Sequence, residues 1–215
     1  MIKAIIFDYD GVIADSFPGV FEVYRKVCAH FKISCPENIE DFRIIYGYKF
    51  TECLKNLGIG ENNFDEAFSI YGEEINKMEY GVFDNILDVI KELKKEYKLY
   101  LISSSHSKEV LPKIEKFKLA NFFEKIYCGA DQKRSKSELF QAFLVEYDYL
   151  PNEVISLGDR AIDYDSSRKA GLPEENIILV NYGWGLDKSR IGNSKVAENP
   201  QLILTLIENG SKKIT

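Results

Sequence analysis

The sequence is poor in the residues that build thiol and zinc sites. Its 215 residues include only two histidines and four cysteines, Cys28, Cys35, Cys53 and Cys128, which are widely separated and form no Cys-x-x-Cys pair. A zinc centre needs clustered cysteine and histidine ligands, and a catalytic thiol needs a base to activate it, so neither is expected. The spacing favours reduced thiols, which are typical of a cytoplasmic protein.

Long apolar runs and basic clusters are scarce as well. No apolar run approaches the length of about 18 residues that crosses a bilayer. The chain enters the apolar segment Ala4-Ile5-Ile6 without a basic and apolar leader. The net charge is -6, from 28 basic and 34 acidic residues that are mixed along the chain. We therefore expect a cytoplasmic protein with no nucleic-acid or membrane partner, as monomer or homodimer.

Two nucleotide-binding motifs are absent. The sequence contains no Gly-x-x-x-x-Gly-Lys-Ser/Thr loop for nucleotide phosphates. The segment Gly183-Trp184-Gly185 has no later glycine and no following helix, so it is not a dinucleotide fingerprint. A kinase built on such a loop is therefore not expected.

Strand and helix patterns alternate along most of the chain. Short apolar runs predict strands at residues 4–6, 99–102, 125–128, 154–157 and 177–180. Helical spacing of apolar residues predicts helices between them, at 83–97, 110–117, 137–147, in the segment ending at Gly171, and at 200–208. This alternation predicts an α/β fold: a Rossmann-like parallel sheet of about five strands with helices on both faces.

Residues 17–80 break the alternation. Apolar residues recur there at helical spacing, with no convincing strand. A block of this kind after the first strand should form a separate helical domain above the carboxyl edge of the sheet. We therefore predict a core of residues 1–16 and 81–215, with 17–80 as an inserted helical domain.

The first strand runs into two carboxylates, Asp8 and Asp10, which Gly11 follows. Glycine lets the backbone turn sharply, so both acids should lie at the strand end, the edge where open α/β sheets bind ligands. The alternative is an acidic turn in which Asp15 or Ser16 caps the next helix.

A second acidic pair, Asp159 and Asp163, follows another apolar strand. A spacing of four puts both on one side of a helix that begins between them, with helix capping as the alternative. Carboxylates gathered at one edge repel by about 4 kcal/mol per close pair at an intermediate dielectric. Mg²⁺ prefers oxygen ligands and relieves this repulsion, and a carboxylate beside it can attack phosphorus.

Groups suited to phosphate lie between the two acidic pairs. The strand at 99–102 ends in Ser103-Ser104-Ser105, which offers hydroxyls and a helix N-terminus, although an ordinary serine cap is the alternative. Lys133 and Lys136 supply positive charge after the third strand. Such lysines are often only solvated, but their position favours a role at the site.

In this order, the segments resemble the haloacid dehalogenase superfamily of phosphohydrolases over roughly residues 2–207. The motifs are Asp8-x-Asp10-Gly11-Val12-x-x-Asp15-Ser16, the strand ending in Ser103, a lone lysine, and Gly158-Asp159-x-x-x-Asp163. The helical insert resembles the family's cap domain of the first type. Asp15-Ser16-Phe17-Pro18 is similar to phosphoglycolate phosphatase-like members, whereas Tyr80 replaces the family's usual proline before Gly81.

The resemblance implies a Mg²⁺-dependent phosphatase that hydrolyses a small phosphomonoester metabolite. Asp8 would attack phosphorus to form an aspartyl phosphate, and Asp10 would protonate the leaving alcohol and then activate water. Mg²⁺ would be bound by Asp8, the backbone carbonyl of Asp10 and Asp159, with Asp163 either a ligand or behind one.

The same resemblance assigns the phosphate-binding groups. Ser103, with Ser104 beside it, would bind phosphoryl oxygens, and Lys136 would neutralise charge between the nucleophile and phosphate, with Lys133 as the alternative lysine. Within the insert, Arg43 and Lys49 flank Tyr46-Gly47-Tyr48, near which the family places a specificity loop. Exposed helix-end cations are the plainer interpretation of this pair.

Other functions stay open. A carboxylate at position 10 disfavours dehalogenases, which lack it. A sugar phosphomutase has the same motif order, but mutases with a comparable cap carry a histidine that is missing near Val20. A phosphoacceptor receiver domain would lack the large insert, and a non-catalytic member that binds a phosphorylated metabolite need not have kept all four aspartates. The sequence does not choose among phosphoglycolate, a sugar phosphate and a nucleotide monophosphate.

Overall fold

A computed structural model describes residues 1–47 and 50–211. The chain divides into two compact units, one made of Met1–Asp15 with Val82–Thr215 and the other of Ser16–Gly81. Lys49 lies outside the described residues, so its predicted role stays a prediction.

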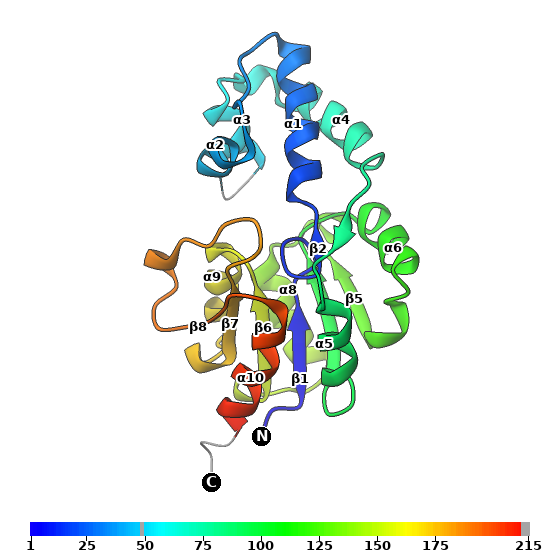
Figure 1. Cartoon of the computed structure of the whole chain (residues 1–215), viewed down its shortest axis with the longest axis vertical. Helices are drawn as coiled ribbons and strands as arrows, with labels where there is room; N and C mark the ends of the chain where they lie inside the picture. The colour runs from blue at the N-terminus through cyan, green and yellow to red at the C-terminus, as the bar shows by residue number, and fades with distance from the viewer. Residues whose placement is uncertain (48–49, 212–215) are drawn as a thin grey trace. The chain divides into compact units, whose positions relative to one another are not determined.

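The first unit is built on a six-stranded sheet whose neighbours pair in parallel, in the order β5-β4-β1-β6-β7-β8 (Figure 1). Its strands are β1 (Ala4–Phe7), β4 (Lys98–Ser103), β5 (Lys125–Cys128), β6 (Val154–Gly158), β7 (Ile177–Val180) and β8 (Lys195–Ala197). The predicted parallel α/β sheet is confirmed. The sheet has one strand more than predicted, β8, which is too short and too polar to be recognised from its sequence.

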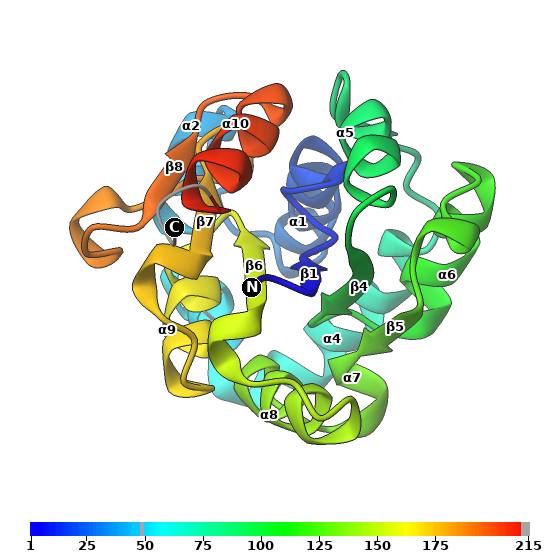
Figure 2. The same cartoon turned by 90° about the horizontal axis from the view of Figure 1, so that it is seen from below.

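Helices cover both faces of this sheet. Helices α5 and α10 pack together on one face, and α8 and α9 pack together on the other (Figure 2). The helices of this unit are α5 (Ile86–Leu93), α6 (Ser107–Lys116), α7 (Gly129–Gln132), α8 (Lys136–Glu146), α9 (Ala161–Lys169) and α10 (Pro200–Ser211). Single 3₁₀ turns occur at η2 (Ala120–Phe122), η3 (Pro151–Glu153), η4 (Glu174–Asn176) and η5 (Lys188–Arg190).

The central strands are buried along their whole length. All residues of β1, β6 and β7 are buried, as expected for parallel strands covered on both faces. On one face, Tyr100 of β4 packs edge-on against Phe143 of α8, with ring centroids 4.7 Å apart. This rigid centre fixes the strand ends from which the acidic turns project.

The register of the sheet explains why distant motifs meet. Phe7 at the end of β1 pairs with Leu101 of β4 and with Leu157 of β6. Asp8 comes one residue after Phe7, Ser103 comes two residues after Leu101, and Asp159 comes two residues after Leu157. All three therefore lie at about the same level of the sheet. Three segments far apart in sequence thus end at one edge.

The second unit is helical. Its elements are α1 (Phe17–Phe31), α2 (Ile39–Ile45), α3 (Phe50–Asn56), η1 (Glu61–Asn63) and α4 (Phe64–Ile75). Phe42 of α2 is fully buried, and its ring centroid lies 5.0 Å from the ring centroids of both Phe21 and Tyr24 of α1. The chain enters through β2 (Ala14–Asp15) and returns through β3 (Gly81–Val82), and these two strands pair. The role of this unit as a cap stays a prediction.

Across the residues that the structure covers, we find no helix that combines the length and the apolar character needed to span a membrane.

Candidate active site

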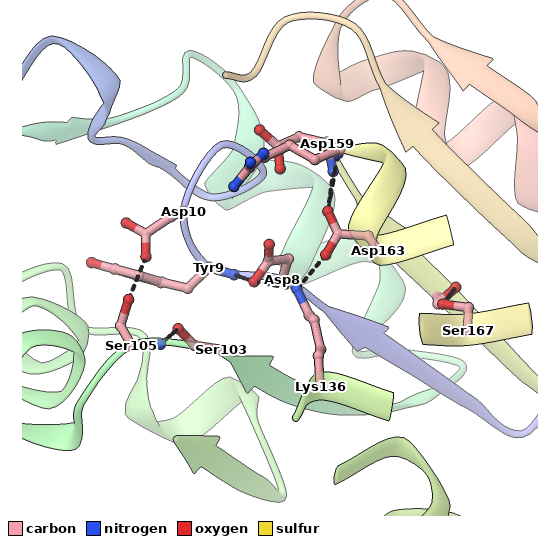
Figure 3. Close-up of polar contacts among 11 residues, drawn as sticks. Asp8, Tyr9, Asp10, Ser103, Ser105, Lys136, Asp159, Asp163 and Ser167 are labelled. Atoms are coloured by element: carbon pink, nitrogen blue, oxygen red, sulfur yellow. Dashed lines mark hydrogen bonds and ion pairs between the residues drawn. The ribbon is translucent and has the colours of Figure 1, made fainter. Parts of the chain in front are cut away.

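Asp8 lies directly beyond β1, in a tight turn (Figure 3). The turn is closed by hydrogen bonds from the backbone N–H groups of Gly11 and Ala14 to the carbonyls of Ala14 and Tyr9, both 2.9 Å long. Gly11 has a φ of +81°, and a Cβ there would lie 1.9 Å from Asp159 Oδ2. Glycine is therefore required both by the backbone conformation and by the close approach of the second acidic turn.

Lys136 connects the two acidic turns. Its Nζ lies 2.8 Å from Asp8 Oδ1 and 2.5 Å from Asp163 Oδ1, and its side chain is almost fully buried. Lys136 is the first residue of α8, whose start is fixed by a capping box between Ser135 and Glu138. Lys133, the alternative lysine, is exposed and forms the left-handed C-cap of α7. The structure thus brings Lys136, and not Lys133, to Asp8.

Asp163 is held on both of its oxygens. Oδ2 accepts the backbone N–H groups of Asp159 and Arg160 at 3.1 and 3.0 Å, and Oδ1 receives Lys136. Asp163 therefore does cap α9, as the alternative interpretation predicted, because it accepts backbone N–H groups at the start of this helix. The same carboxylate also anchors the buried lysine.

Asp159 is bound on only one side. Its Oδ2 accepts the backbone N–H of Trp184 at 2.7 Å. Its Oδ1 is buried, and no described residue donates a hydrogen bond to it. A buried carboxylate oxygen without a donor is costly unless another group binds it.

Asp10 points away from this cluster toward the end of β4 (Figure 3). The Ser105 hydroxyl donates to Asp10 Oδ2 at 3.1 Å. Ser105 in turn donates its backbone N–H to Ser103 Oγ at 3.0 Å. Among the described residues the Ser103 hydroxyl donates to no acceptor, so its proton is available to an anion. Ser103 is buried, whereas Ser104 is exposed.

Burial controls the electrostatics of the cluster. Burial raises the pKa of Asp8 to about 7, against the opposing pull of Lys136. Burial, followed by the charges of Asp163 and Asp8, raises the pKa of Asp159 well above its ordinary range. Burial alone would lower the pKa of Lys136, but the two carboxylates beside it raise that pKa above its usual value. Without a further cation, the cluster resists full ionisation.

The residues present fit a hard divalent cation. Asp8, Asp159 and Asp163 each offer one carboxylate oxygen, and these oxygens lie within 4.8 Å of one another. When all are ionised, three carboxylates and one ammonium leave two negative charges, and no described residue donates to the buried Asp159 Oδ1. An all-oxygen donor set of this kind suits Mg²⁺. Asp10 is outside this side-chain group; the sequence assigned it a backbone contact only.

Two of the helix-capping alternatives are not observed. Ser16 occupies the N-cap of α1, but its side chain makes no capping hydrogen bond. None of the three serines at the end of β4 caps α6; His106 is the N-cap residue, and Asp131 accepts the Ser107 N–H at 2.9 Å. A carboxylate from α7 therefore takes the role that a serine cap would have, which local sequence spacing could not reveal.

Two contributors to the site were not predicted as such. In the sequence, Ser105 is one of three consecutive serines, and Trp184 stands in a Gly-Trp-Gly segment that is not a dinucleotide motif. Trp184 acts through its backbone N–H, which any residue type except proline would supply. No side-chain signal could have found it.

Arg43 belongs to the helical unit. Its guanidinium lies 4.7 Å from the centroid of the Phe17 ring, and its Nε lies 3.4 Å from Glu40 Oε2. The expected contact of Arg43 with substrate stays a prediction.

Comparison with known proteins identifies the family. The model described as "Haloacid dehalogenase-like hydrolase" matches residues 5–174. The chain belongs to this family, so the predicted family is confirmed, while the roles of the individual motif residues stay predictions.

Curated relatives share about a quarter of its residues. "Tyrosine-protein kinase PtkA" of Mycobacterium tuberculosis is 26% identical over 190 residues, which are 85% of this chain but only 63% of that protein. "Phosphorylated carbohydrates phosphatase" of Thermotoga maritima is 24% identical and is covered over 99% of its length, by 96% of this chain. "Phosphoglycolate phosphatase" of Thiobacillus denitrificans is 22% identical over 85% of each chain.

Solved structures share the fold. A haloacid dehalogenase-like family hydrolase from Streptococcus pneumoniae matches with a TM-score of 0.84 at 21% identity, covering 96% of this chain and 98% of that one.

Proposed function

We propose that this chain is a phosphoric monoester hydrolase that releases phosphate from a small phosphorylated metabolite through an aspartyl phosphate on Asp8. The observation that carries the proposal is the buried Lys136 ammonium, whose Nζ lies 2.8 Å from Asp8 Oδ1. Ser103 and Asp159 lie at the same edge of the sheet. Phosphoryl transfer depends mainly on positioning and on charge stabilisation, which this arrangement supplies.

In the first step, an Asp8 carboxylate oxygen attacks phosphorus, and the bond from phosphorus to the ester oxygen breaks. The leaving alkoxide takes a proton from Asp10, whose carboxyl is held by Ser105. Ser103 donates its hydroxyl to a phosphoryl oxygen, and Lys136 balances the charge beside Asp8.

In the second step, water attacks the same phosphorus and gives a proton to Asp10. The bond from phosphorus to Asp8 breaks, which regenerates the carboxylate and frees inorganic phosphate. Asp10 thus returns to its protonated state, so the cycle closes without any other proton carrier.

Asp8 and Asp159 would hold Mg²⁺, together with the backbone carbonyl of Asp10. Both Asp163 oxygens already accept hydrogen bonds, which supports a role in orienting the metal ligands and not in binding the metal directly. When bound, Mg²⁺ would supply Lewis-acid polarisation of the phosphoryl group and neutralise the cluster.

The helical unit would select the leaving group, with Arg43 and Lys49 as the first residues to test. Two relatives are named for phosphorylated carbohydrates and phosphoglycolate, which supports a small phosphorylated metabolite as substrate. All four cysteines are unpaired, which supports the expected cytoplasmic location.

The test is phosphate release from a panel of phosphoglycolate, sugar phosphates, nucleotide monophosphates and an activated aryl phosphate, with and without Mg²⁺. We expect Mg²⁺-dependent release from at least one ester and none from the Asp8→Asn variant. Isomerisation of a sugar phosphate without net phosphate release would identify a mutase instead. No turnover of any ester, the aryl phosphate included, would contradict the proposal.

A further inference from the structure

The segment Tyr182-Gly183-Trp184 follows β7, the strand beside β6 and its Asp159. This segment matches no nucleotide-binding motif, but it contacts both acidic turns. The Trp184 N–H donates to Asp159 Oδ2 at 2.7 Å, and the Tyr182 hydroxyl donates to the Val12 carbonyl at 3.1 Å. One short segment therefore ties the turn after β1 to the carboxylate after β6.

Gly183 makes the closest approach. A Cβ at this position would lie 2.3 Å from the Gly11 carbonyl oxygen and 2.6 Å from Asp159 Cβ. Both distances are far below any normal contact, and the first involves backbone that cannot rotate away. The absence of a side chain is therefore what lets the segment pack against both turns.

These contacts fix the orientation of Asp159. The backbones of Gly11 and Gly183 both approach its carboxylate closely, since a Cβ at either position would collide with Oδ2. Oδ2 is committed to Trp184, and the buried Oδ1 has no donor among the described residues. The side chain is thus locked with one oxygen satisfied and one left available.

We propose that Tyr182-Gly183-Trp184 is a positioning element for the divalent cation, because it holds Asp159 with Oδ1 presented as a metal ligand. This inference rests on the proposed function, which makes Asp159 a ligand. It goes beyond that function, because it assigns to the segment after β7 the role of increasing the affinity for the cation. Groups that orient a ligand typically change metal affinity by about 10-fold to 100-fold when they are altered.

The test is calorimetric titration of Mg²⁺ into the full chain without substrate. We expect Gly183→Ala to weaken Mg²⁺ binding by about tenfold or more, since Asp159 must move. Tyr182→Phe loses one hydrogen bond and should weaken binding by about threefold. Gly60→Ala is the matched control, because Gly60 has an ordinary φ of -68° and open space around its Cβ position.

A second cation separates positioning from general damage. Mg²⁺ demands near-octahedral geometry, whereas Ca²⁺ accepts flexible coordination, so a displaced Asp159 should weaken Mg²⁺ binding more than Ca²⁺ binding. An equal loss for both ions would overturn the positioning role. So would Mg²⁺ affinities in folded Gly183→Ala and in Tyr182→Phe that match the parent chain. If Gly183→Ala does not fold, Tyr182→Phe decides alone.

Asp159→Asn distinguishes failure of this inference from failure of the proposed metal site. If Asp159→Asn abolishes Mg²⁺ binding while the two segment variants bind normally, only the positioning role is overturned. If Asp159→Asn binds Mg²⁺ as the parent chain does, the metal assignment fails and the positioning role fails with it.

Discussion

The two acidic turns follow adjacent strands and each carries two aspartates, but their carboxylates have different surroundings. After β6, Asp163 in the first turn of α9 accepts three donors, and Asp159 in the turn itself accepts one. In the turn after β1, Asp8 is bound by its neighbour's N–H and by Lys136, and Asp10 is held by the Ser105 hydroxyl. The same residue type thus serves as an anchor in one place and as an available oxygen in another.

Lys136 makes the two turns a single electrostatic unit. It balances one carboxylate from each turn, Asp8 and Asp163, at nearly equal distances. Substitution in the first turn should therefore affect chemistry, whereas substitution of the anchor in the second should affect folding.

The largest effect is expected from Asp8→Asn. The amide keeps the shape of the side chain but cannot act as the proposed nucleophile, so phosphate release should fall by about 10⁴-fold or more. Steady-state phosphate release measures the loss, and circular dichroism should show an unchanged fold.

The matched control is Asp88→Asn, an exposed aspartate that pairs with Lys91 at 2.8 Å. Its turnover should equal that of the parent chain. Retention of full activity by Asp8→Asn would rule out Asp8 as the nucleophile.

The next effect tests the anchor. Asp163→Ala would remove one of the two carboxylates at the buried Lys136, which keeps Asp8, and would leave two backbone N–H groups at the start of α9 without their acceptor. Because Asp8 still balances Lys136, the main loss is the acceptor of the two N–H groups, and buried donors left unsatisfied should lower the free energy of unfolding by about 1–3 kcal/mol. Urea denaturation of metal-free protein measures it.

Asp88→Ala serves as the surface counterpart, and its exposed pair should contribute less than about 1 kcal/mol. If Asp163→Ala were no less stable than Asp88→Ala, the anchoring role would be wrong.

Much of the fold could be read from the sequence. Buried parallel strands such as Ile177–Val180 are continuous apolar runs, and their alternation with helices dictates a parallel sheet. The order of strands then carries Asp8, Ser103 and Asp159 to one edge. The acidic pairs were found because strand ends are where such sheets bind ligands.

The division of labour among the carboxylates could not be read in the same way. It depends on backbone donors, such as Trp184 N–H, and on whether a neighbouring side chain reaches, as Lys136 does and Lys133 does not. Asp131 capping α6 is another case, because its partner is 24 residues away in sequence. Such contacts are set by packing, which local pattern does not encode.

The third effect is a pH dependence of the metal-free chain. Because burial raises the pKa of Asp8 to about 7, folded protein keeps a proton that the unfolded chain has lost between about pH 4 and 7. The free energy of unfolding should therefore fall as pH rises through this window, by up to about 1.4 kcal/mol per pH unit for each such proton. Urea denaturation in chelator at pH 5 and 7 measures the slope.

Saturating Mg²⁺ should reduce this slope, because the bound ion favours the ionised carboxylates. Asp8→Asn should reduce it without Mg²⁺. The half-buried Glu74 and the exposed Asp131, whose pKa values are lowered to about 2 by their hydrogen-bond partners, titrate below this window. A slope that is unchanged in Asp8→Asn would mean that Asp8 is not its source.

The smallest effect concerns the hydrogen bond that holds Asp10. Ser105→Ala removes the hydroxyl that donates to Asp10 Oδ2, so the proposed general acid is less well placed. An alkyl phosphate, whose leaving alkoxide needs a proton, should lose about tenfold in kcat/KM, since this constant reports the step in which the alcohol leaves. An activated aryl phosphate, whose leaving group departs unprotonated, should lose much less.

Ser105→Thr keeps a hydroxyl and should restore most of the loss on the alkyl ester. Ser189→Ala is the control, because its hydroxyl also donates to an aspartate, Asp187, but on an exposed turn. A merely structural role for Ser105 would lower kcat/KM equally for both classes of ester. Equal losses would therefore remove Ser105 from the proton-transfer step.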